Sequence, residues 1–81
     1  MVVHSKYISQ YVANEIPTGN IDGINKYFEL ANTPQNNSVV VRLSGLIQVP
    51  GASKDYTLSG SIITFLKAPK IGQEVVVNYF Y

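Results

Sequence analysis

The sequence contains no cysteine and a single histidine, His4, among its 81 residues. Disulfide bonds and thiolate metal sites are therefore excluded, and one imidazole is too few ligands for a zinc site. A chain of this length buries only about 60% of its unfolded surface on folding, so its stability is marginal without help. We expect that help to come from association with other subunits.

Charge is also scarce, because Asp, Glu, Lys and Arg make up 14% of the residues and the net charge is +1. An average soluble domain has about 25% of these residues. The basic residues are scattered, which argues against nucleic-acid binding through phosphate contacts. A neutral surface rich in Asn, Ser, Thr and Gln suits close packing against other proteins, although an ordinary soluble β-domain could share this composition.

Long apolar runs are missing as well. The longest are a few residues, far below the roughly 20 that a membrane-spanning helix needs. Residues 1–6 lack the apolar core of a signal peptide. We therefore expect synthesis in a cytoplasm and no membrane partner.

The sequence does contain a series of short segments with alternating polar and apolar residues, separated by glycine and proline turns. Ser44-Gly45 and Ser59-Gly60 are typical of tight hairpin turns, and no segment shows a helical period. Turn signals roughly 8–12 residues apart indicate a sandwich or small barrel. The predicted fold is all-β: a small antiparallel β-sandwich or partly open barrel of six or seven strands with an N-terminal arm.

The predicted arm covers residues 1–13, which alternate weakly and have no cleanly apolar face. We interpret the arm as a docking or oligomerisation strand that pairs with a neighbouring subunit. Residues 14–25 are rich in Pro, Gly, Asn and Asp and are predicted to be a turn region. The sandwich or barrel domain then covers residues 14–81.

The residues that could carry chemistry form no catalytic set. A nucleophile triad needs a base, and the one histidine lies in the predicted arm. A calcium loop around Asp22 lacks the spacing and helices of an EF-hand, and turn formation explains the same residues. The acidic residues are predicted to be solvated surface charges in turns or exposed strand positions: Glu15, Asp22, Glu29, Asp55 and Glu74. We predict no enzyme activity, no metal and no cofactor.

The aromatic residues divide into two groups. Phe28, Tyr56, Phe65 and Tyr79 alternate with apolar partners and are predicted to lie in the core. The others are harder to bury, and Phe80 must face away from its neighbours in the last strand, either in a contact or beneath the arm. Because aromatic residues are enriched at protein interfaces, we predict an interface formed by the five remaining aromatic side chains together with Val3: Val3, Tyr7, Tyr11, Tyr27, Phe80 and Tyr81.

Residues 14–81 also resemble a small β-module that occurs repeatedly in virion proteins of tailed bacteriophages, including capsid decoration proteins, head fibres and tail fibres. Ser44-Gly45 stands where the family has an Asn-Gly turn. The similarity rests on the order of the following residues and segments: Asn25, Phe28, Leu30, Pro34, residues 41–46, 55–57 and 63–65, Ala68-Pro69, Gly72, Val75, Val77 and Tyr79.

The resemblance implies a non-enzymatic structural protein of a phage particle, located in the virion after assembly in the host cytoplasm. Only a short arm precedes the module, which favours a capsid decoration or cement subunit that binds other virion proteins and forms homo-oligomers. Alternatives are a tail or tail-fibre component with a receptor- or carbohydrate-binding role, and a head–tail connector component.

Overall fold

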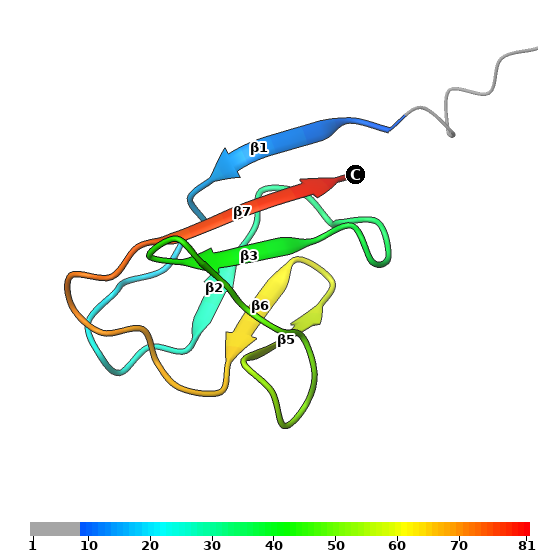
Figure 1. Ribbon diagram of the computed structural model, residues 1–81. Coiled ribbons are helices and arrows are strands. Elements are labelled where there is room, and N and C mark those ends of the chain that lie inside the picture. Colours follow the sequence, from blue (N-terminus) through cyan, green and yellow to red (C-terminus); the bar gives the residue numbers. More distant parts are fainter. Residues whose placement is uncertain (1–8) are drawn as a thin grey trace, which may run out of the picture.

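The computed structural model describes residues 9–81, which form two antiparallel β-sheets packed face to face (Figure 1). The four-stranded sheet has the order β1-β7-β3-β4 and the three-stranded sheet the order β2-β6-β5. Within the described residues there are seven strands and no helix, which confirms the predicted all-β fold. The strands are β1 (Tyr11–Glu15), β2 (Tyr27–Glu29), β3 (Val40–Leu43), β4 (Leu46–Ile47), β5 (Tyr56–Ser59), β6 (Ile62–Phe65) and β7 (Val75–Phe80).

The core lies between the two sheets and draws on both. The four aromatic residues predicted to be internal are all buried, and the ring of Phe65 packs edge-on against Phe28 with centroids 5.5 Å apart. Such edge-to-face pairs stabilise a core beyond the area they bury. The nine buried apolar residues are Phe28, Leu30, Val41, Tyr56, Ile63, Phe65, Val75, Val77 and Tyr79.

Two tight hairpins connect neighbouring strands, as the turn signals predict. In the β3–β4 hairpin, Ser44 and Gly45 both have positive φ, 49° and 87°, the conformation of a type I′ turn. The β5–β6 hairpin pairs Ser59 with Ile62, so its loop is Gly60-Ser61. The predicted turn at Ser59-Gly60 is therefore wrong by one residue, because Ser59 still belongs to the ladder.

Strand β1 spans the predicted boundary at residue 13, because it runs from Tyr11 to Glu15 and pairs with β7 of the same chain. Val12 pairs with Tyr79 and Glu15 with Val77, so two β1 residues oppose one on β7. Asn14, with φ of 57°, forms this bulge, and asparagine tolerates that conformation better than most residues. Simple alternation predicts Val12 and Glu15 on opposite faces, whereas the bulge places both on the core side.

Gly19 lies directly against the core residue Phe28. Thr18, its neighbour, exchanges two backbone hydrogen bonds with Glu29 of β2, at 2.8 and 2.9 Å. A Cβ atom on Gly19 would lie 2.5 Å from Cδ2 of Phe28 and 2.8 Å from the carbonyl oxygen of Tyr27. Because Phe28 is buried and the carbonyl belongs to a strand, neither atom can easily move away.

We predict that Gly19→Ala lowers the free energy of unfolding by about 1–3 kcal/mol, the usual cost of overpacking a core. Urea denaturation followed by circular dichroism measures the change. Gly51→Ala is the matched control, since its Cβ would meet the flexible side chain of Lys54 at 2.8 Å. The control should lower the free energy of unfolding by a smaller amount. Equal decreases in the two variants would contradict the proposed steric role of Phe28.

Candidate interaction surface

The side of the four-stranded sheet that faces away from the core is its outer face. Directly paired residues of neighbouring strands project to the same side of a sheet. Tyr11 pairs with Phe80, Val40 with Asn78, and Arg42 with both Val76 and Ile47. The outer face therefore consists of Tyr11, Val40, Arg42, Ile47, Val76, Asn78 and Phe80.

This outer face is unusually apolar for a surface in contact with solvent. The exposed fractions are 55% for Tyr11, 63% for Ile47 and 41% for Phe80, and the other members of the face are half-buried. Arg42 is the one charged residue in the set. An antiparallel sheet with one solvated face normally carries polar residues on that face. This face is therefore the candidate interaction surface of the described residues.

Side-chain contacts hold the aromatic end of the outer face in place. The Tyr11 ring lies 4.7 Å from the Phe80 ring at an angle of 47°. The Tyr11 hydroxyl accepts a hydrogen bond from Nδ2 of Asn78 at 2.9 Å. Nη1 of Arg42 makes a longer contact of 3.4 Å with Oδ1 of Asn78. The three strands β1, β7 and β3 are thus linked across the face, and contacts within the chain hold Tyr11 in place.

On the core side, Glu15 fixes β1 to the rest of the protein. The Tyr79 hydroxyl donates a hydrogen bond of 2.5 Å to Oε1 of Glu15, and Oε2 accepts one of 2.7 Å from the Ala31 amide. Nδ2 of Asn32 lies 3.4 Å from the same hydroxyl. Glu15 was expected to be a solvated surface charge. It is instead half-buried, because the bulge at Asn14 turns it toward the only hydroxyl of β7.

The structure brings together only part of the predicted interface. Tyr11 and Phe80 are in contact on the outer face, so Phe80 lies beside the arm and is still exposed. Tyr81 is exposed too, but its ring lies 6.2 Å from that of Tyr79, toward the core side of the sheet. Val3 and Tyr7 lie outside the described residues.

Tyr27 belongs to a different surface, the outer side of the three-stranded sheet. It pairs with Thr64, which in turn pairs with Thr57. The tyrosine is 63% exposed and borders a small cleft of about 240 Å³ that both threonines also line. Tyr27 is therefore a candidate site separate from the outer face.

The segment around Asp22 is a hydrogen-bonded turn, as its residues predict. Oδ1 of Asp22 accepts the amide protons of Ile24 and Asn25 at 2.9 and 2.8 Å. These bonds, that from Asn25 foremost, lower the pKa of the carboxyl. Among residues 9–81, no group of three or more His, Cys, Asp or Glu side chains is placed to hold a metal ion. The described part of the chain likewise forms no helix that could cross a membrane.

Five members of the outer face were not among the predicted interface residues: Val40, Arg42, Ile47, Val76 and Asn78. Alternation places Val40 and Arg42 on one face of their strand, and Val76 and Phe80 on one face of theirs. The sequence therefore contained part of the information needed to predict the outer face. This information was insufficient because it does not reveal that β3 and β7 are neighbours or how they are aligned. Only that alignment turns separate strand faces into one surface.

Comparison of the chain with protein-family models, curated proteins and solved structures finds no match. The similarity to phage virion modules therefore stays a prediction from the order of residues in the sequence.

The buried phenol of Tyr79 makes the stability of the protein sensitive to alkaline pH. Burial raises the pKa of Tyr79, and its hydrogen bond to Glu15 raises the pKa further. Burial also raises the pKa of Tyr56. An unfolded tyrosine has a pKa of about 10. The neutral phenol is therefore favoured by folding, and this stabilisation is complete below about pH 10 and is lost as the pH rises through the raised pKa.

We predict that the free energy of unfolding falls above about pH 10 and that Tyr79→Phe makes this fall shallower. The variant also loses a hydrogen bond to a charged group, which should cost about 1–3 kcal/mol at neutral pH. Urea denaturation at a series of pH values measures both effects. Tyr27→Phe is the control, because it removes an exposed hydroxyl. If the free energy of unfolding of Tyr79→Phe fell above about pH 10 as steeply as that of the wild type, Tyr79 would not be the source of the alkaline sensitivity.

Proposed function

We propose that this chain is a non-enzymatic structural subunit of a bacteriophage particle, a capsid decoration or cement protein that binds other virion proteins. The observation that carries the proposal is the apolar outer face of the four-stranded sheet, with Arg42 as its one charge. The location in a virion is proposed from the similarity of residues 14–81 to phage virion modules. A second observation supports the general role: Tyr11 is already fixed by Phe80 and Asn78. A pre-ordered contact residue reduces the entropy lost on binding.

The outer face has the features of an interface core. Two aromatic rings lie at one end of the face, Ile47 lies on its edge strand, and Arg42 is its one charge, so charged groups are few, as in the buried parts of protein interfaces. Among residues 9–81, the edge strand β1 has a neighbouring strand on only one side of its backbone. A partner subunit or a second copy of the chain can therefore bury side chains on the face and extend the sheet at the same time. We propose that homo-oligomers form in the same way.

Mass spectrometry of purified phage particles from the host that carries this gene tests the location, and the chain should be present. Ile47→Glu should reduce incorporation by roughly ten-fold or more, because a carboxylate buried without a partner is costly. Ile24→Glu is the matched control, since Ile24 is 81% exposed and lies outside the outer face. Absence of the chain from particles would overturn the proposal, and equal incorporation of both variants would exclude this face.

A receptor- or carbohydrate-binding role in a tail or fibre is the second candidate function. The exposed ring of Tyr27, beside Thr57 and Thr64 at the small cleft, supports it. A glycan array with the purified protein tests this role. Binding should be lost in Tyr27→Ala and kept in Ile47→Glu, and the absence of any bound glycan would argue against the role.

A further inference from the structure

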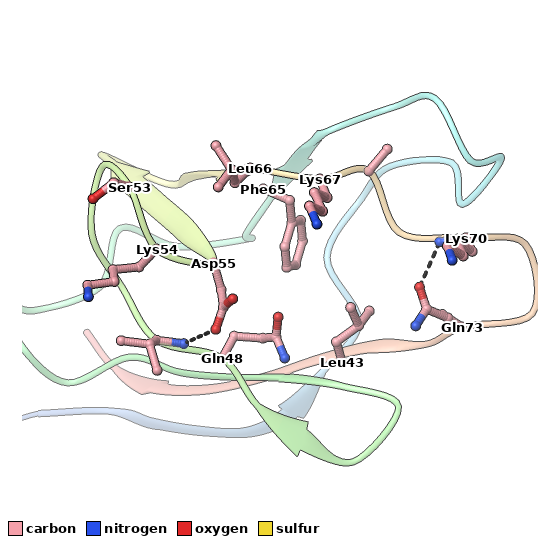
Figure 2. Close-up of a pocket in the computed structure, with 12 residues that line it drawn as sticks. Leu43, Gln48, Ser53, Lys54, Asp55, Phe65, Leu66, Lys67, Lys70 and Gln73 are labelled. Carbon is pink, nitrogen blue, oxygen red and sulfur yellow. Dashed lines mark hydrogen bonds between the residues drawn. The ribbon is translucent and has the colours of Figure 1, made fainter.

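A larger cleft, of about 620 Å³, opens at the end of the sandwich near the β3–β4 hairpin (Figure 2). Its walls come from residues 48–55 and 65–73, with Leu43 of β3 on the floor. Figure 2 shows Phe65 and Lys67 on one wall and Gln48 opposite them, with Lys70 and Gln73 at one end and Asp55 at the other. The volume falls within the range of roughly 300–1,000 Å³ typical of ligand sites.

Positive charge is concentrated around this cleft. Its lining contains three lysines, Lys54, Lys67 and Lys70, against one acid, Asp55. The chain has six basic and five acidic residues, so the lining carries +2 and the remaining three basic and four acidic residues sum to −1. Oδ2 of Asp55 already accepts the Val49 amide proton at 2.8 Å, which occupies part of the acid's hydrogen-bonding capacity. The cleft therefore differs in charge from the rest of the molecule.

The lining also offers apolar surface. Val49 and Leu66 are large apolar side chains that remain about half exposed, and both border the cleft. They offer apolar surface to a ligand. The aromatic residue of the lining, Phe65, is buried in the core and offers no open ring for stacking a nucleic-acid base.

We infer that this cleft binds an acidic segment of a partner protein, with carboxylates facing Lys67 and Lys70 and an apolar side chain against Val49 and Leu66. A single inorganic anion would leave most of the cleft and its apolar lining unused. A protein segment with alternating acidic and apolar residues matches both the charge and the size. The inference rests on the proposed function, because it gives the subunit a second contact with its partner, on a surface distinct from the outer face.

Titration of the ¹⁵N-labelled protein with an acetylated, amidated Glu-Leu-Glu-Leu peptide tests the inference by NMR. The amide signals of Gln48, Leu66, Lys67 and Gln73 should shift, and a Gln-Leu-Gln-Leu peptide should produce no such shifts. Lys67→Ala and Lys70→Ala should each weaken binding roughly two- to five-fold, as expected for an exposed ion pair. Lys26→Ala removes the same charge outside the cleft and should leave the affinity unchanged.

Several results would overturn the inference. The Gln-Leu-Gln-Leu peptide could bind as well as the Glu-Leu-Glu-Leu peptide. Lys26→Ala could weaken binding as much as Lys67→Ala, or the amide signals that shift could belong to residues outside the cleft. Sodium acetate or a short oligothymidylate that binds the same residues as tightly as the peptide would also overturn it, in favour of a simple anion site or a nucleic-acid site.

The peptide titration is independent of the particle experiment. If the peptide binds in the cleft but the chain is absent from virions, the proposed function fails and the acidic-ligand site stands. If the chain is present in virions but the peptide does not bind, the inference about the cleft fails and the structural role stands.

Discussion

The phenolic hydroxyl of Tyr79 imposes the constraint on which the arrangement of the four-stranded sheet depends. Tyr79 is fully buried on β7, and a buried hydroxyl must find a hydrogen-bond partner. Glu15 supplies that partner, and it can do so only because Asn14 adds one residue to β1 and turns the carboxylate inward. The same pairing fixes the alignment of β1 with β7. That alignment in turn sets Tyr11 beside Phe80 on the opposite side of the sheet.

Much of the fold could be predicted from the sequence because burial and alternation agree in the central strands. Val75, Val77 and Tyr79 alternate with outward-facing residues, and all three are buried. Ser44-Gly45 marks a two-residue turn because glycine readily adopts positive φ. The loop at Gly60-Ser61 was misplaced by one residue because serine and glycine next to each other allow either position for a turn.

The candidate surface was less predictable, and the reasons are physical. A bulge depends on one residue, Asn14, in a segment whose Asn, Pro and Gly content otherwise indicates turns. Glu15 was therefore predicted to be a solvated charge. Its hydrogen-bond partner, Tyr79, lies 64 positions away in the sequence, so no local pattern indicates the interaction. Phe80 could be predicted to be exposed by alternation alone. Whether Phe80 shares a face with Ile47 and Arg42 depends on which strands are neighbours. Strand order is a long-range property that local patterns do not encode.

The scarcity of charge on the outer face has a kinetic consequence. Proteins with complementary charged surfaces attract each other at a distance, whereas surfaces with few charges find each other by diffusion and correct orientation alone. Association through this face is then expected at the unsteered rate, on the order of 10⁵–10⁶ M⁻¹s⁻¹, and should change little with salt. A tight complex would owe its affinity to slow dissociation. A complex held through this face alone would form gradually and dissociate rarely.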